Sequence, residues 1–183
     1  MGAPRIIAGT SKGRTLTVPQ GLDTRPTNAR ARQAAFDILL HAPWAGTAFL
    51  RAARVLDVFS GSGAYGLEAL SRGAASASFI EQSPPALAAL RANIAACKAS
   101  SLASVFAVDA TNPPVGRAHD LVFLDPPYGQ GLVPRALAAL AARGWLVPGA
   151  IILAELGPGD DFVPDQPLAE RTHGKARLVF WRA

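Results

Sequence analysis

The sequence predicts an α/β protein built on a mostly parallel, doubly wound sheet. Short apolar, β-branched segments alternate along the chain with longer segments whose apolar residues recur at helical spacing. A glycine-rich stretch, residues 60–66, joins the first central strand to the helix that follows it. Half of the 183 residues are apolar, which is enough for one domain with a hydrophobic core.

The N-terminal segment is predicted to form a hairpin followed by a helix. Residues 5–9 and 14–18 resemble short strands, and the turn at 11–13 joins them. After a stretch rich in helix breakers, Thr27 can cap a helix that runs to about residue 40. We expect 1–50 to be a basic extension and 51–183 the main domain, both folding as a single unit.

The central body alternates between strands and helices. The expected strands are 54–59, 77–81, 105–109, 121–125 and 151–155, and the expected helices are 64–72, 84–99 and 131–143. The tail, 169–182, contains a further strand at 177–181 beside a returning one. Because ligands of such sheets bind beyond the carboxyl ends of the strands, the loops at that edge are the candidate site.

Composition and charge exclude several classes of protein. No apolar run reaches the ~18–20 residues of a membrane span, and the N-terminus has no apolar signal core. The single cysteine, Cys97, excludes an internal disulfide and predicts a cytoplasmic protein. Three scattered histidines without cysteine partners argue against a metal site. Residues 1–54 carry a net charge of +6 and the remainder −1, which favours a nucleic-acid partner at one end.

The glycine loop predicts a nucleotide-type cofactor. Gly61, Gly63 and Gly66 match the spacing G-x-G-x-x-G, which alone is also compatible with a tight turn that binds nothing. Asp57, on the strand before the loop, is poorly placed beside a pyrophosphate. It is well placed beside a cationic group such as the methionine amino group of S-adenosylmethionine, which is the cofactor we expect.

Two further carboxylates follow strands near this loop. Glu81 comes about 20 residues after Gly61, a position that suits hydrogen bonds to both ribose hydroxyls. Asp109 ends the third expected strand and could accept a hydrogen bond from the adenine amino group. The predicted cofactor-binding residues are Asp57, Phe59, Gly61, Ser62, Gly63, Gly66, Glu81, Asp109 and Ala110.

The tetrapeptide Asp125-Pro126-Pro127-Tyr128 predicts a binding site for a planar amine. Two prolines fix the backbone and remove two N–H donors, so the loop presents acceptors: the Asp125 carboxylate and the Pro126 carbonyl. An exocyclic amino group donates two hydrogen bonds and could satisfy both, while Tyr128 stacks on the base. We assign these four residues to catalysis. A rigid turn without ligand is the alternative.

The basic N-terminal residues are predicted to hold RNA phosphates. A hairpin and a helix start would gather several of them on one face, near the mouth of the active site. Cations at the start of a helix oppose its dipole, and an anionic ligand offsets that cost. The expected RNA contacts are Lys12, Arg14, Arg25, Arg30 and Arg32.

The chain resembles the bacterial small-subunit (16S) ribosomal RNA guanine-N2 methyltransferases of the RsmD type. The resemblance rests on the following segments: 5–7, 13–14, 18–19, 25–27 with Arg30, Arg32 and Phe36, then 57–63, 66–73, 79–81 and 125–129. It implies a Rossmann-like, seven-stranded class I methyltransferase sheet with an N-terminal β-hairpin and helix extension. It also implies a guanine of small-subunit ribosomal RNA as the substrate, free or in an assembled particle. Tyr65 departs from the small or aliphatic residue expected after Gly63-Ala64.

Other functions remain open at this level. The D-P-P-Y loop does not separate guanine-N2 from adenine-N6 methylation of DNA or RNA, or from glutamine methylation, although no target-recognition domain is apparent. A nicotinamide oxidoreductase is disfavoured by Asp57 and by the D-P-P-Y loop. A catalytically inactive RNA-binding assembly factor is disfavoured by the intact acids. A serine hydrolase would need the frame G-x-S-x-G, which Ser62 lacks.

Overall fold

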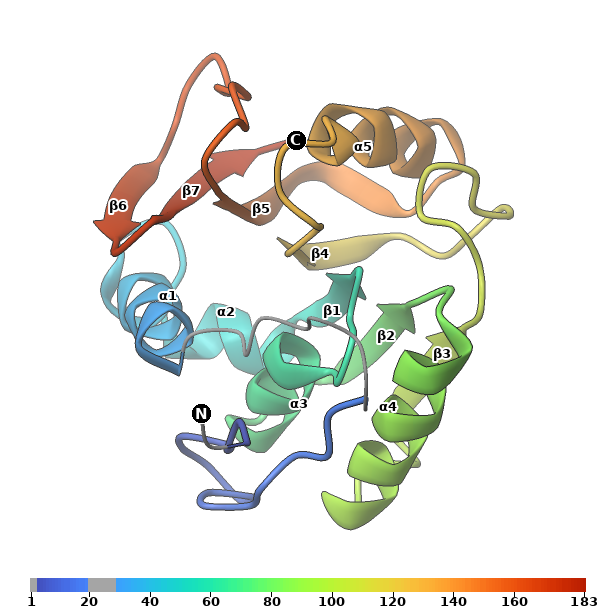
Figure 1. Cartoon of the computed structure of the whole chain (residues 1–183). Helices are drawn as coiled ribbons and strands as arrows, with labels where there is room; N and C mark the ends of the chain where they lie inside the picture. Colours follow the sequence, from blue (N-terminus) through green and yellow to red (C-terminus); the bar gives the residue numbers. More distant parts are fainter. Residues whose placement is uncertain (1–2, 20–28) are drawn as a thin grey trace.

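Seven strands form one mixed sheet in the order β3-β2-β1-β4-β5-β7-β6 (Figure 1). The structure is a computed structural model and describes residues 3–19 and 29–183. The strands are β1 (Arg54–Val58), β2 (Ser76–Ile80), β3 (Ala103–Phe106), β4 (His119–Leu124), β5 (Leu146–Leu156), β6 (Ala169–His173) and β7 (Ala176–Arg182). Strands β1 to β5 are parallel, and β7 runs antiparallel to both β5 and β6.

Helices cover both faces of the sheet, as Figure 1 shows for α5 on one side and α3 and α4 on the other. The helices are α1 (Ala29–His41), α2 (Thr47–Ala52), α3 (Ala64–Ser71), α4 (Pro84–Ala96) and α5 (Leu132–Ala142). Successive strand residues point to opposite faces, so Val55 packs with α1, α3 and α4, whereas Leu56 packs with α5. In the described part of the chain, no helix has the length and apolarity to cross a membrane.

The predicted fold class is confirmed, with corrections at three elements: the third strand, helix α2 and the N-terminal hairpin. The third strand ends at Phe106 rather than at residue 109. Asp109 instead closes a turn, because its carboxylate accepts hydrogen bonds from the N–H and Oγ1 of Thr111. Helix α2 was not predicted from the sequence; it is short, and no side chain caps its start. The proposed cap Thr27 lies outside the described residues.

The predicted N-terminal hairpin is reduced to one antiparallel bridge between Arg5 and Thr15. Ile6 N–H still donates to the carbonyl of Arg14 at 2.9 Å, but the next two N–H groups of the first arm bind α3 instead of the second arm. Ile7 and Ala8 both donate to the carboxylate of Glu68, at 2.7 and 3.1 Å. The N-terminal segment, residues 3–19, is therefore docked on α3.

Candidate active site

The carboxyl ends of three neighbouring strands bring the predicted loops together. Val58, the last residue of β1, is paired with Ile80 of β2 and with Leu124 of β4. Each of these strands ends there, so the glycine loop, Glu81 and Asp125 start side by side at one edge of the sheet. This is the edge at which parallel α/β sheets bind ligands.

The three glycines of the loop have different structural roles. A Cβ on Gly63 would lie 2.5 Å from Leu90 Cδ1, and one on Gly66 would lie 2.3 Å from Phe79 Cε1, so both are needed for close packing. Gly61 has a φ of +52° and open space where a Cβ would stand. The backbone at Gly61 is therefore the part of the loop that a ligand can approach.

Asp57 supports the loop from beneath. Its side chain is only 2% exposed, and it accepts a hydrogen bond of 2.8 Å from the N–H of Gly66. Burial raises the pKa of Asp57 to about 8; the Gly66 hydrogen bond lowers it, the charge of Glu81 raises it, and that of Arg32 lowers it. A cationic amino group beside Asp57 would stabilise the ionised form. Direct contact with a cofactor stays a prediction.

Glu81 joins the loop to the start of α4. Its carboxylate accepts hydrogen bonds from the backbone N–H groups of Gly61, Gln82 and Ser83, at 2.8 to 2.9 Å. A carboxylate has about four acceptor positions, so one remains for a ligand hydroxyl. Asp109 is exposed and Ala110 is buried in the turn after β3.

The chemical groups of these residues match those needed to bind S-adenosylmethionine. The backbone at Gly61 is open, and the exposed carboxylate of Asp109 can accept from an amino group. The hydroxyl of Ser60 is buried beneath the loop with no hydrogen-bond partner among the described residues. Phe59 begins the loop with a positive φ of 60°, and the carbonyl of Ser62 is held by Asn93 at 2.9 Å.

The D-P-P-Y loop leaves β4 beside the glycine loop. Asp125 is half-buried, Pro126 is buried and Pro127 is exposed. Tyr128 is half-buried, and its hydroxyl donates to Glu155 at 3.0 Å. The loop therefore offers a carboxylate and an aromatic ring at the mouth of the cofactor loop.

Sequence reasoning missed two residues of this region. Glu155, near the end of β5, is buried at 5% exposure, and Tyr65 at the start of α3 donates to it at 3.1 Å. Glu155 lies next to the last residue of β5, as Asp57 does in β1, and that shared position near a carboxyl end was the available signal. Tyr65 was noted only as unusual after the glycine loop.

Arg32 does not lie on the surface, contrary to the prediction that it contacts RNA. Its side chain is 0% exposed, it forms an ion pair with Glu68 at 3.7 Å, and it donates to the carbonyl of Arg5. Burial lowers the pKa of Arg32, and the charge of Glu68 acts against that shift. Arg32 therefore holds α1 and the N-terminal segment on α3.

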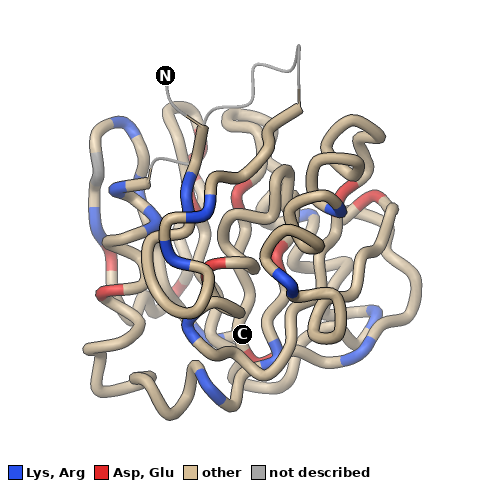
Figure 2. Tube along the Cα trace, turned by 90° about the horizontal axis from the view of Figure 1, so that it is seen from below, with Lys and Arg blue, Asp and Glu red and all other residues tan. Residues whose placement is uncertain are grey.

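The other predicted RNA contacts that the structure describes, Lys12, Arg14 and Arg30, do not form one cluster near the site. The turn that carries Lys12 is bound to the far ends of two crossover helices: Thr10 N–H donates to the carbonyl of Ser71, and the Ser11 hydroxyl donates to that of Cys97. These helix ends lie away from the edge with the glycine loop, so the expectation that Lys12 lies near the mouth of the site is wrong. Figure 2 shows Lys and Arg spread over several sides of the molecule.

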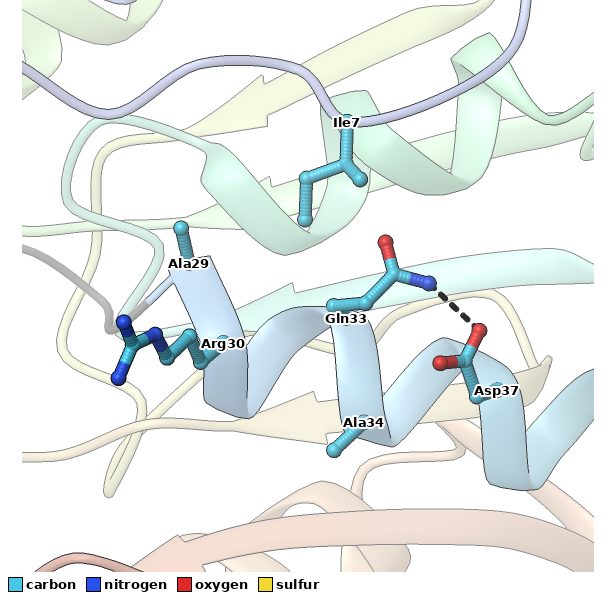
Figure 3. Close-up of a pocket in the computed structure, with 6 residues that line it drawn as sticks. All are labelled: Ile7, Ala29, Arg30, Gln33, Ala34 and Asp37. Atoms are coloured by element: carbon cyan, nitrogen blue, oxygen red, sulfur yellow. Dashed lines mark hydrogen bonds between the residues drawn. The ribbon is translucent and has the colours of Figure 1, made fainter.

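Arg14 and Arg30 are both exposed, and Arg25 lies outside the described residues. Arg14 acts electrostatically on Cys97, which places it with Lys12 at the end of α4. Arg30 extends from the first turn of α1 and lines a hollow of about 440 Å³ together with Ile7 (Figure 3). RNA contact by these three arginines stays a prediction.

The strand order, the antiparallel β7 and the glycine loop after β1 define the class I methyltransferase fold. Two solved structures agree over nearly their whole length. A putative methyltransferase from Escherichia coli has a TM-score of 0.83 at 35% identity, with 99% of this chain and 98% of that chain covered. A putative methylase from Haemophilus influenzae has a TM-score of 0.78 at 31% identity, with the same coverage. The protein is thus a methyltransferase.

The particular family follows from sequence comparison. The family model described as Conserved hypothetical protein 95 matches residues 4–181, and the chain belongs to this family. Relatives named Ribosomal RNA small subunit methyltransferase D include one from Escherichia coli K12, 39% identical over 156 residues, which cover 84% of this chain and 75% of the relative. The Haemophilus influenzae Rd relative is 35% identical over 159 residues, with 84% and 79% covered.

Proposed function

We propose that this enzyme transfers a methyl group from S-adenosylmethionine to the exocyclic N2 amine of a guanine in small-subunit ribosomal RNA. One observation carries the proposal: the D-P-P-Y loop and the glycine loop leave adjacent, hydrogen-bonded strands at the same edge of the sheet. A cofactor on one loop and an amine on the other would then meet. The relatives' name, Ribosomal RNA small subunit methyltransferase D, supports the choice of RNA.

The cofactor supplies an activated methyl group on a sulfonium, and the protein supplies positioning. Transfer of this methyl group to the amine lone pair would form a C–N bond, and the electron pair of the broken C–S bond would stay on the departing thioether. Asp125 and the Pro126 carbonyl accept hydrogen bonds from the amine and orient its lone pair toward the methyl carbon. The proton lost from nitrogen goes to Asp125 or to water. Such orientation can account for most of a rate enhancement without covalent catalysis.

The direct test is methyl transfer followed by nucleoside analysis. Cofactor labelled in the methyl group is incubated with unmodified small ribosomal subunits and, separately, with free small-subunit RNA. Labelled N2-methylguanosine is expected, and the better of the two substrates identifies the partner. Labelled N6-methyladenosine would instead support the adenine reading of the D-P-P-Y loop. No transfer to either substrate, with cofactor bound, would support an inactive binding protein.

The assignment of Asp125 can be tested within the same assay. Asp125→Ala should lower methyl transfer by about 100-fold or more, because the amine loses its orienting acceptor. The affinity for S-adenosylhomocysteine, measured by calorimetry, should change little. Asp120→Ala is the matched control, because Asp120 lies near the opposite end of the same strand, where it binds Arg54. Parent turnover in Asp125→Ala would refute the assignment.

A further inference from the structure

One buried carboxylate receives the hydroxyls of both tyrosines in this chain. The sequence contains two tyrosines, Tyr65 and Tyr128. Tyr65 donates to Oε2 of Glu155 at 3.1 Å, and Tyr128 donates to Oε1 at 3.0 Å. Glu155 is 5% exposed and Tyr65 3% exposed, so the centre of this bridge is buried, while Tyr128 is half-buried.

The two tyrosines belong to the two loops of the active site. Tyr65 is the second residue of α3, directly after the glycine loop, and Tyr128 ends the D-P-P-Y loop. They lie 63 positions apart in the sequence and have no segment in common. Glu155, from β5, is therefore a direct hydrogen-bonded link between the cofactor loop and the loop proposed to bind the amine.

Tyr65 is held firmly enough to act as the fixed end of this link. Its ring stacks on Phe123 with centroids 4.9 Å apart and on Phe36 at 6.5 Å. Burial raises the pKa of Tyr65, and the charges of Glu155 and Asp125 raise it further. The hydroxyl of Tyr65 therefore stays protonated at neutral pH and remains a donor to Glu155.

Tyr128 is restrained on a second side by the segment after β5. A Cβ on Gly157 would lie 1.9 Å from Cδ2 of Tyr128, so the ring packs directly on the Gly157 backbone. Asp160 accepts hydrogen bonds from the N–H groups of Gly157 and Gly129, both at 2.9 Å. The segment 155–160 thus fixes both the ring and the residue that follows it.

We infer that Glu155 is a positioning residue for methyl transfer: its carboxylate orients the Tyr128 ring and, through Tyr65, couples the glycine loop to the D-P-P-Y loop. This inference rests on the proposed function for its catalytic consequence, but the link itself can be measured without RNA. Each carboxylate oxygen of Glu155 accepts from a different tyrosine, so a change at one ring can reach the other through this side chain.

The link can be observed by fluorine NMR of protein labelled with 3-fluorotyrosine, which has two signals because the chain has two tyrosines. Replacing Tyr65 by Phe assigns one signal and should move the signal of Tyr128 by several linewidths. In a Glu155→Leu background, the same replacement should leave the Tyr128 signal in place. Asp165→Asn, which changes an exposed carboxylate, is the control and should move neither signal. An unmoved Tyr128 signal in Tyr65→Phe would overturn the link.

The catalytic role is tested by comparing Glu155→Ala, Glu155→Gln and Tyr65→Phe in the methyl-transfer assay. Glutamine can accept from one tyrosine hydroxyl and donate to the other, so it preserves the bridge in weaker form. We expect kcat/KM for RNA to fall about 100-fold in Glu155→Ala and about tenfold in both Glu155→Gln and Tyr65→Phe. The affinity for S-adenosylhomocysteine should change less than about threefold in all three.

The outcomes separate the inference from the proposed function. If the parent protein methylates no RNA, the proposed function fails, while the NMR experiment still decides the link. If the parent is active and Glu155→Ala keeps its kcat/KM, the positioning role is wrong. If Glu155→Gln is as impaired as Glu155→Ala, the charge acts on the reaction directly and the positioning role is again wrong. Tyr65→Phe keeps the aromatic packing. Its melting temperature, compared with that of the parent, shows whether a loss of activity comes from unfolding.

Discussion

At the scale of single residues, the most unusual group is the buried carboxyl of Asp57. It holds the start of α3 through Gly66, yet its burial disfavours the ionised form and raises its pKa to about 8. In the unfolded chain, the pKa of Asp57 is near its ordinary value of 3.8. The native state therefore binds the proton more tightly than the unfolded state, so the contribution of Asp57 to stability is present at low pH. It is lost as the pH rises from about 4 to about 8.

Asp57→Asn should remove this pH dependence. The amide oxygen of asparagine can still accept from Gly66, but the side chain cannot ionise. Relative to the parent, the melting temperature of Asp57→Asn should therefore rise between pH 5 and pH 9 by at least about 2–4 °C, the shift for 1 kcal/mol in a domain of this size. Calorimetry across this range measures it. The melting temperature of Asp165→Asn should change with pH as that of the parent does. If the melting temperature of Asp57→Asn also changed with pH in parallel with the parent, the assignment would be contradicted.

At the scale of elements, α3 organises the N-terminal half of the molecule. Glu68 is 0% exposed and accepts hydrogen bonds from the N–H groups of Ile7 and Ala8, while Arg72 donates to it at 2.7 Å. It also pairs with Arg32 of α1. The helix that follows the glycine loop thus binds both the N-terminal segment and α1 through a single carboxylate.

Glu68→Ala should be strongly destabilising, because it leaves the buried guanidinium of Arg32 without its counter-ion. Breaking a buried ion pair by removing one partner typically costs about 3–5 kcal/mol. The free energy of unfolding, from urea titration, measures this, and amide exchange in residues 3–19 should accelerate. The matched control is Glu170→Ala: Glu170 is 43% exposed, pairs with Arg177, and should contribute less than about 1 kcal/mol. Equal losses in the two variants would refute the role of Glu68.

At the scale of the whole molecule, the positive charge is distributed rather than concentrated at the site. Lys12 and Arg14 lie by the end of α4, whereas Arg30 is at the start of α1. The buried neighbour Arg32 acts on Asp57 and Tyr65, so the start of α1 lies near the site. RNA that contacts all three exposed cations must therefore extend across the docked N-terminal segment.

This distribution predicts that RNA length decides which cations matter. Replacing both Lys12 and Arg14 by Ala should reduce the log–log salt slope for binding of long small-subunit RNA by roughly one to two, at ~0.7–0.9 per phosphate contact. For a short stem-loop that carries only the target guanine, the slope should not change. Arg30→Ala should lower the slope for both RNAs. Filter binding over a range of salt concentrations measures this. Unchanged slopes for long RNA in the double variant would remove Lys12 and Arg14 from the interface.

Much of the fold was predictable because its signals are local. Apolar periodicity located all the strands of the sheet core and the helices between them, and glycines marked the loop after β1. The end of β3 was misplaced because a side-chain turn at Asp109 replaced the ladder. The hairpin was overestimated because two N–H groups of its first arm, those of Ile7 and Ala8, pair with Glu68, about 60 positions away in sequence.

The sequence by itself determined the alternation of elements, the strand-end loops and the types of chemical group they carry, because periodicity and turn residues act over a few positions. Only the tertiary structure decided which charges are buried and which carboxylate joins the two loops. In the sequence, Arg32 cannot be distinguished from an exposed basic residue. It is buried only because α1 packs against Glu68. Glu155 becomes a bridge only when residues 90 and 27 positions away fold against it. Burial and partner choice depend on contacts between distant segments, which no local pattern encodes.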